Sequence, residues 1–361
     1  MSDVRLPDFQ TLLAQARGAR ERSDFTALAA AADVLLRLSP REPRALVLKA
    51  DALSGQGDHR AAVSFYGAAL AHGRAVASPS LDLRAELERA GRAQAEGARR
   101  FEQGLRDGLE ARGFDPTSSS ARFAASLDLM TGRRRLYAQQ PKFYMFPGLP
   151  QIEFQPRETV AWLVGVEAAA SAIRAELDAV LAEPALFAPY VEDRANRPKT
   201  EQAGMLDNAA WSAVFLWKDG AEVPDIAARC PETMRALAEA PLCRIPGRSP
   251  SILFSKLQAG AKIPPHHGLI NTRLICHLPL IAPPGSHFRV GGDVREWKEG
   301  QAWAFDDTIE HEAWNDSGRD RTILIFDVWK PEITTEEQDL IRALFATIDA
   351  AGGSGAPKLG V

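Results

Sequence analysis

Two stretches in the C-terminal third of the chain decide its fold. They are PHHGLINTRLICHLPL at residues 265–280 and FDDTIEHEAWNDSGRDRTILIFDVWKPEIT at residues 305–334. Each contains an apolar run of strand length, Thr272–Leu280 and Thr322–Val328, next to a segment rich in Gly, Asn, Asp or Pro. Short apolar runs bounded by such turn residues are typical of strands. We therefore predict that this part of the chain is a β domain.

Three more runs upstream and between these stretches have the same character: Trp211–Trp217, Ser251–Gln258 and Gln301–Phe305. Many short strands separated by turns indicate a sandwich, a barrel or a jelly roll. An amphipathic pattern over 163–180 predicts one helix before the strands. A last helix is predicted over Glu336–Ala346, followed by the Gly-rich end AGGSGAPKLGV.

The first third of the chain is rich in Ala, Leu and Arg and poor in β-branched residues, which predicts helices. A weak repeat places Asp24 and Ala27 in the positions of Asp58 and Ala61, 34 residues later, and resembles a tetratricopeptide repeat. Two repeats are fewer than a free-standing solenoid needs, so we expect them to pack beside the β domain and shape its entrance. The predicted organisation is a helical region at 1–112, a linker at 113–140, the β domain at 141–347 and a flexible tail at 348–361.

Composition excludes several classes of protein. The chain of 361 residues has 43 Lys and Arg against 47 Asp and Glu, which argues against a protein that coats nucleic acid. No window approaches the roughly 20 apolar residues of a membrane span. The start of the sequence lacks a secretory signal, so we predict a cytoplasmic protein. Cys230, Cys243 and Cys276 form no disulfide framework; Cys230 and Cys243 could pair in an oxidising compartment, but reduced thiols fit the prediction better.

Histidines are concentrated in the β domain, where five of the seven fall between His266 and His311. This pair, at predicted strand edges, has the spacing of a facial iron site, in which a His-x-carboxylate pair and a distant His hold Fe(II). The carboxylate is missing here because Gly268 stands two residues after His266. The spacing alone therefore leaves two interpretations open: a metal site, or ordinary hydrogen-bonded histidines of a β domain.

The surrounding sequence resembles the aspartyl/asparaginyl β-hydroxylase family from Phe146-Pro147-Gly148-Leu149 to Pro331, most closely over Ser255–Trp329. The resemblance implies an Fe(II)- and 2-oxoglutarate-dependent oxygenase with a double-stranded β-helix, a jelly-roll or cupin-like fold. Members of this family carry H-x-G, as His266-His267-Gly268 does, and water takes the third position. The fold class expected for the whole chain is α+β, with a tetratricopeptide-like helical region before the oxygenase domain.

The resemblance also implies a role for individual residues. By this resemblance, His266 and His311 are the iron ligands. Ser255 and Arg321 bind the distal carboxylate of 2-oxoglutarate as a clamp. His277 donates a hydrogen bond to the carboxylate nearer the metal, and Trp211 forms a wall of the cofactor pocket. Physical chemistry supports the clamp, because a guanidinium matches a carboxylate in geometry and is costly to bury unpaired.

Alternatives remain for some of these positions. For Trp211 the alternative is simple packing in the core, which is the commoner role of tryptophan. Asp306, Asp307 and Glu310 are candidates for a replacement carboxylate ligand, although the family pattern does not use them. Cys276 alternates away from the site, so a nucleophilic role for it is not expected.

Two departures from the family pattern concern the substrate. The family motif R-x-R-x-H reads here Arg273-Leu274-Ile275-Cys276-His277, and Leu269 replaces the usual proline. Strand alternation places Arg273, Ile275 and His277 on one face. We therefore predict a substrate with one anionic anchor, bound by Arg273, and an otherwise less acidic or more hydrophobic structure. The alternatives are a rim salt bridge for Arg273 and another Arg that restores the lost charge.

The predicted function is a dioxygenase that uses Fe(II), O2 and 2-oxoglutarate to hydroxylate a C–H bond. The expected target is the β-carbon of an Asp or Asn in a peptide, a protein or a free amino acid. The alternatives are hydroxylation of a lipid acyl chain and a non-catalytic module that binds a protein partner through the helical repeats.

Overall fold

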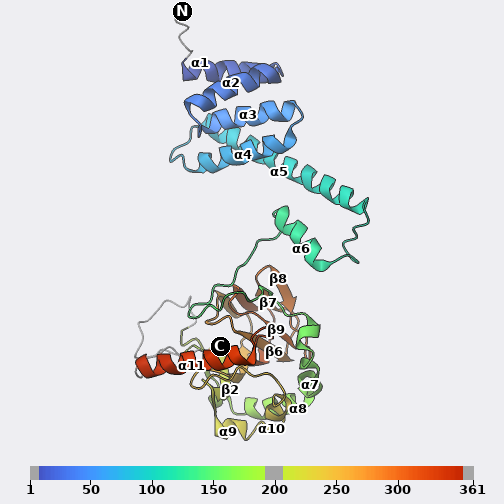
Figure 1. Ribbon diagram of the computed structural model, residues 1–361, viewed down its shortest axis with the longest axis vertical. Helices are drawn as coiled ribbons and strands as arrows, with labels where there is room; N and C mark the ends of the chain where they lie inside the picture. Colours follow the sequence, from blue (N-terminus) through green and yellow to red (C-terminus); the bar gives the residue numbers. More distant parts are fainter. Residues whose placement is uncertain (1–7, 192–205, 353–361) are drawn as a thin grey trace, which may run out of the picture. The chain divides into compact units, whose positions relative to one another are not determined.

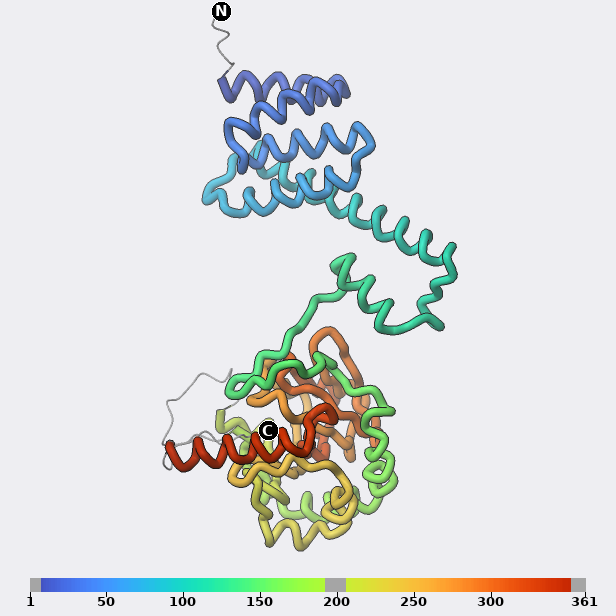
Figure 2. Tube along the Cα trace, in the orientation of Figure 1, coloured from blue at the N-terminus to red at the C-terminus, as the bar shows by residue number. Residues whose placement is uncertain are grey.

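The computed structural model describes residues 8–191 and 206–352, and the chain divides into a unit that ends at Arg134 and a second unit that begins at Arg135 (Figure 1). The first unit is helical. Its helices are α1 (Phe9–Glu21), α2 (Phe25–Leu38), α3 (Pro43–Gly55), α4 (His59–Arg74), α5 (Leu81–Glu110) and α6 (Ala121–Met130). Consecutive helices from α1 to α5 pack against each other, as the blue to cyan part of the tube shows (Figure 2).

Local sequence explains where these helices begin. The side chains of Asp24 and Asp58 each accept a hydrogen bond from the backbone N–H three residues on, and so cap α2 and α4. Gly57, at φ +87°, makes the turn between α3 and α4, which favours a residue without a side chain. The helices α1 to α5 lie within the predicted helical region 1–112, whereas α6 lies inside the predicted linker 113–140. The tetratricopeptide identity of this unit stays a prediction.

The second unit is built on antiparallel strands. They are β1 (Ala188–Pro189), β2 (Trp211–Lys218), β3 (Ala221–Glu222), β4 (Ile252–Leu257), β5 (Lys262–His266), β6 (Arg273–Ile281), β7 (Ser286–Val290), β8 (Asp293–Glu296), β9 (Trp303–Phe305), β10 (His311–Asn315) and β11 (Arg321–Trp329). One sheet has the order β1-β2-β4-β11-β6-β9, with β3 paired to β2, and the other has the order β5-β10-β7-β8.

The order of the strands identifies the fold. From β4 to β11 the chain passes between the two sheets at every step except the β7–β8 hairpin. Each sheet thereby pairs early strands with late ones, as β4 with β11 and β5 with β10. Eight strands wound in this way form a jelly roll, the double-stranded β-helix. The predicted fold class, helices followed by a jelly-roll domain, is confirmed.

Alternation along β6 separates two cores. Leu274, Cys276 and Leu278 face the helices α7 (Leu163–Ala168) and α8 (Ala170–Leu181), which cover the outer side of the larger sheet. Ile275 faces the space between the sheets. All three cysteines are buried and free. One predicted helix over 163–180 is thus two helices that meet at Ala169.

The remaining helices lie in connections and at the end of the second unit. They are η1 (Arg157–Val160), η2 (Pro184–Leu186), α9 (Pro224–Ala227), α10 (Pro231–Ala236) and α11 (Thr335–Gly352). α11 packs Ile341 and Phe345 against Trp329. The helix continues to Gly352, so the predicted flexible tail does not begin at 348. Residues 353–361 of that tail lie outside the described residues. In the described part of the chain, no helix combines the length and hydrophobicity that a membrane crossing requires.

Candidate active site

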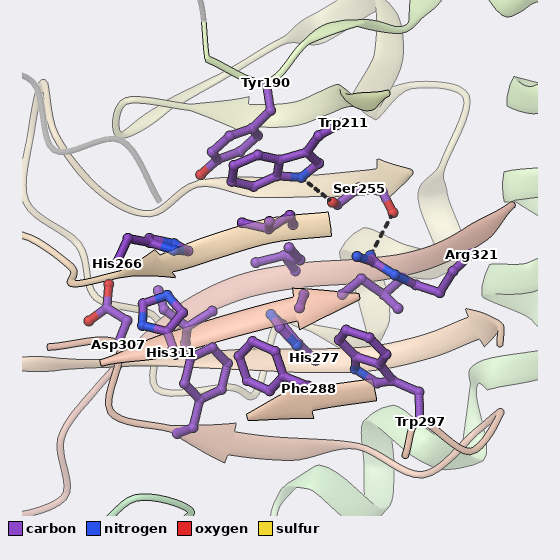
Figure 3. Close-up of a pocket in the computed structure, with 16 residues that line it drawn as sticks. Tyr190, Trp211, Ser255, His266, His277, Phe288, Trp297, Asp307, His311 and Arg321 are labelled. Carbon is purple, nitrogen blue, oxygen red and sulfur yellow. Dashed lines mark hydrogen bonds between the residues drawn. The ribbon is translucent and has the colours of Figure 1, made fainter. Parts of the chain in front are cut away.

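His266 and His311 face each other across two neighbouring strands. The β5–β10 register pairs these residues directly, and their ring centroids lie 4.0 Å apart (Figure 3). The Nδ1 atom of His266 lies 2.8 Å from the carbonyl oxygen of Pro264, and that of His311 lies 3.0 Å from the carbonyl oxygen of Ile309. Because a carbonyl only accepts, each Nδ1 carries the proton and each Nε2 keeps its lone pair. Metal-binding histidines are oriented in this way by a backbone carbonyl.

The protonation state of the pair also fits a metal. Burial lowers the pKa of His266 and lowers that of His311 well below its ordinary value, so both rings are neutral near pH 7. Neutral imidazole is the form that binds a divalent transition metal. Among residues 8–191 and 206–352, no three or more His, Cys, Asp or Glu side chains are arranged to hold a metal ion. The protein donor set is thus two imidazoles, which leaves most coordination positions of a metal ion to water and to small-molecule ligands.

Gly268 leaves room for a carboxylate beside this pair. A Cβ atom on Gly268 would lie 2.1 Å from Oδ2 of Asp307, a distance at which the Asp307 side chain must move. Asp307 is nearly buried and lines the same cavity as the two histidines. The carboxylate nearest to this position therefore comes from the segment before His311, and an H-x-D arrangement has no space here. The other two acidic candidates are engaged elsewhere: Asp306 binds Lys330 at 2.6 Å and Glu310 binds Arg289 at 2.9 Å.

We expect the Gly268→Ala substitution to lower the free energy of unfolding by about 1–3 kcal/mol, the usual cost of adding a methyl group to a packed interior. Gly165→Ala is the matched control, because a Cβ there meets nothing within 4 Å and the site lies in α7. Urea unfolding followed by tryptophan fluorescence measures both, since all seven tryptophans lie in the second unit. Equal stabilities of the two variants would contradict the assigned packing of Asp307.

A cavity extends from the histidines between the two sheets. It is lined by sixteen residues, which are Tyr190, Trp211, Ser255, Ile263, His266, Ile275, His277, Phe288, Trp297, Phe305, Asp307, His311, Ala313, Arg321, Ile323 and Ile325. Six of the seven predicted site residues are among them. Figure 3 shows the histidines and Asp307 at one end and Arg321 with Trp297 at the other.

Arg321 is a buried cation without a counter-charge. Its side chain is 1% exposed, and within the described ranges no carboxylate pairs with it. Its Nη1 donates to the carbonyl oxygen of Ser255 at 3.3 Å, its Nε has no partner, and its guanidinium lies 4.6 Å from the ring centroid of Trp297. Burial lowers the pKa of Arg321 to about 9. An anion in the cavity is the partner that this arrangement lacks.

Further polar atoms lie near Arg321. Nε1 of Trp211 donates to Oγ of Ser255 at 3.1 Å, which leaves the hydroxyl hydrogen of Ser255 free to donate to a ligand (Figure 3). Nδ1 of His277 is buried without a hydrogen-bond partner. Tyr190 stacks on Trp211 with 4.2 Å between ring centroids. Neither Tyr190 nor Trp297 is a sequence-predicted site residue, because each reaches the cavity from a short segment with no strand periodicity around it.

The structure places Arg273 differently from the sequence-based expectation. It lies on the predicted face of β6 but is fully buried and does not line the cavity. Its Nη1 lies 3.3 Å from Oδ2 of Asp327, and its Nη2 lies 3.6 Å from Oδ2 of Asp307. The prediction of a substrate anchor at Arg273 is therefore wrong for this arrangement, since two carboxylates already balance its charge. The alternative of a salt bridge is correct in kind, but the bridge is buried and not at a rim.

Comparisons with known proteins agree with this geometry. Residues 167–331 match the family model described as Aspartyl/Asparaginyl beta-hydroxylase. The aspartyl/asparaginyl beta-hydroxylase of Mus musculus is 33% identical over 148 residues, 40% of this chain and 19% of that protein. The ornithine lipid ester-linked acyl 2-hydroxylase of Rhizobium tropici is 34% identical over 176 residues, which are 48% of this chain and 59% of that protein. Aspartate beta-hydroxylase domain-containing protein 2 of Rattus norvegicus is 26% identical over 212 residues, which are 58% of this chain and 60% of that protein. The chain thus spans from about a fifth to three fifths of these relatives.

Proposed function

We propose that the second unit is an Fe(II)- and 2-oxoglutarate-dependent hydroxylase domain of the aspartyl/asparaginyl β-hydroxylase family, whose model matches residues 167–331. The observation that carries the proposal is Arg321, a buried guanidinium without an acidic partner in the described residues, at the end of a cavity that leads to two neutral histidines. An anionic ligand long enough to reach from Arg321 toward the histidines satisfies both ends. A dicarboxylate that also chelates a metal meets this requirement.

Each lining residue has a place in this proposal. His266 and His311 would hold Fe(II) through Nε2, oriented by the backbone carbonyls at their Nδ1 atoms. Arg321 and Ser255 would bind the distal carboxylate of 2-oxoglutarate, with Trp211 holding the hydroxyl in position. His277, whose Nδ1 lacks a partner, would hydrogen-bond the carboxylate nearer the metal. The aromatic walls surround these groups with apolar atoms, and the low local dielectric strengthens the charge-assisted contacts.

Bound Fe(II) and 2-oxoglutarate supply the oxidation: O2 is consumed, 2-oxoglutarate becomes succinate and CO2, and one oxygen atom enters a C–H bond of the substrate. The protein contributes binding and orientation. Since two histidines bind a metal less tightly than two histidines and a carboxylate, we expect iron to dissociate readily from the purified protein.

The substrate follows from the relatives only as a proposal. Hydroxylation of an Asp- or Asn-type residue corresponds to the name of the mouse relative, and hydroxylation of a lipid acyl chain corresponds to the name of the Rhizobium relative. Ile275 in the cavity wall favours the less acidic of these two substrates, the lipid acyl chain. The helical unit is proposed to recruit a protein partner or substrate, and the cytoplasm is the proposed location.

The test is iron-dependent turnover of 2-oxoglutarate to succinate, measured by mass spectrometry with panels of peptides, amino acids and acyl compounds. We expect succinate formation by the iron-loaded protein and none by the His266→Ala/His311→Ala double variant, which should also lose Fe(II) in equilibrium dialysis. Undiminished iron binding by the double variant would contradict the metal assignment. A metal-bound structure with Asp306, Asp307 or Glu310 on the iron would contradict the two-histidine donor set.

A further inference from the structure

The charges around the cavity are unequally distributed between its two ends. Among the described residues that line it, Arg321 is the one arginine or lysine. Arg321 and Ile275 stand at opposite ends: Ile275 pairs in register with Asp327 of β11, six residues from Arg321. Six residues of strand span about 20 Å. One guanidinium therefore cannot bind an anion at both ends.

The end near the histidines offers a carboxylate instead of a cation. Asp307 lines the cavity there, and its Oδ1 is buried without a hydrogen-bond partner (Figure 3). The nearest guanidinium on the same face of β6, that of Arg273, is held by Asp327 and Asp307 outside the cavity wall. A substrate carboxylate placed here would meet the Asp307 carboxylate and an aliphatic side chain, Ile275, rather than a partner.

The remaining walls are apolar. Ile263, Ile275, Ile323 and Ile325 line the cavity together with Ala313 and Phe288. Lys142 is the exposed cation that acts on His266 from the segment before β1, but it does not line the cavity. Because its ammonium group is solvated, it attracts an anion outside the cavity more readily than at the reacting carbon.

We propose that the part of the substrate that enters this cavity is an uncharged aliphatic chain, and that Ile275 and Asp307 exclude an acidic side chain from the position beside the histidines. The inference rests on the proposed function and specifies its substrate class. The same chemistry is presented by an acyl chain and by an aliphatic amino-acid side chain, so the test includes one small compound of each kind.

The experiment measures binding to the full-length protein loaded with Zn(II), which has no redox chemistry, with and without 2-oxoglutarate. Three probes are titrated by calorimetry: N-octanoyl-glycinamide, N-acetyl-leucinamide and N-acetyl-aspartamide with a free side-chain carboxylate. We expect at least one neutral probe to bind roughly 10-fold or more tightly than the acidic probe, because a buried unpaired carboxylate is penalised. Which neutral probe binds better identifies the source of the chain. Tighter binding of the acidic probe by the wild type would overturn the proposal.

Two variants reverse the selectivity if the assignment is correct. Ile275→Arg supplies a cation at this end and should improve binding of the acidic probe roughly 10- to 100-fold, the value of a charge-assisted hydrogen bond. Because burial raises the pKa of Asp307 to about 7, the titrations are made at pH 8, where this carboxylate is mostly ionised. Asp307→Asn keeps the shape, removes that repelling charge and should shift the preference in the same direction, which keeps the test decisive if the arginine variant does not fold. Lys142→Met is the control and should leave the affinity for the neutral probes unchanged. Unaltered selectivity in both variants would refute the roles of Ile275 and Asp307.

The proposed function and the substrate class fail in different ways. Failure to bind 2-oxoglutarate would refute the cosubstrate assignment, while the titrations without 2-oxoglutarate still report which probe the cavity prefers. Normal 2-oxoglutarate binding with tighter binding of the acidic probe would refute the substrate class alone.

Discussion

Replacing Arg321 by methionine is expected to stabilise the ligand-free protein while removing its affinity for 2-oxoglutarate. The pKa of this buried guanidinium falls from 12.5 to about 9 in the folded state. The penalty for burying the charge is fully present below pH 9 and disappears as the pH rises from 9 to 12.5, because over that range the unfolded chain binds the extra proton. The difference between the two pKa values corresponds to a destabilisation of at most about 5 kcal/mol. Methionine fills much of the same volume without the charge, so a net gain of about 1–4 kcal/mol is expected at pH 7.

Loss of the same guanidinium leaves the distal carboxylate of 2-oxoglutarate unpaired in a buried site. This should weaken binding by about 3–5 kcal/mol, roughly 10²- to 10³-fold or more. Ser255→Ala is the matched control, because it removes one hydroxyl contact to the same carboxylate and should cost about 1.5–3 kcal/mol. Calorimetric titration measures the affinities, and tryptophan fluorescence in urea measures the stability. Equal losses of affinity in the two variants, or destabilisation of the ligand-free Arg321→Met protein, would show that the guanidinium already has a partner.

The strands with long apolar runs and the short strand β9 were predictable from the sequence, and the other short strands were not. β2, β4, β6 and β11 are continuous runs that the sequence identifies. β5 has the sequence KIPPH, and its two prolines argue against a strand by local rules. It tolerates them because it lies at the edge of the smaller sheet, where one side of the backbone needs no ladder partner. Edge position depends on the order of all the strands, which no local pattern contains.

The site residues also divide into those that the sequence predicts and those that only the fold reveals. His266 and His311 are recognisable because the residue type and the H-x-G motif carry the chemistry. The place of Arg273 is not recognisable, because alternation determines which face of β6 it occupies but not whether that part of the face is cavity or core. Its partners Asp327 and Asp307 lie 54 and 34 positions further along the chain, so only the fold brings them together. The contact between Gly268 and Asp307 is hidden for the same reason.

The segment that carries His311 is held by a second buried ion pair, and this pair predicts a large effect on stability. Nζ of Lys330 lies 2.6 Å from Oδ2 of Asp306, and both side chains are almost completely buried. Nε2 of Gln139 donates to the same oxygen at 2.7 Å, and the backbone N–H of Thr308 donates to the other carboxylate oxygen at 3.0 Å. The pair thereby joins the end of β11, the segment before β1 and the turn that leads into His311.

Lys330→Met should lower the free energy of unfolding by about 3–5 kcal/mol, because it leaves the Asp306 charge buried without its cation. Lys262→Met is the matched control: Nζ of Lys262 lies 3.7 Å from Asp316, both side chains are exposed, and the loss should stay below about 1 kcal/mol. Adding Asp306→Asn to Lys330→Met removes the orphaned charge and should recover part of the stability, which a double-mutant cycle in urea quantifies. Because Asp306 also fixes the turn before His311, Lys330→Met should weaken Zn(II) binding by roughly 10- to 100-fold, as loss of a supporting contact does. A Lys330→Met protein as stable as the Lys262→Met control would mean that the turn is held by Gln139 and Thr308 alone.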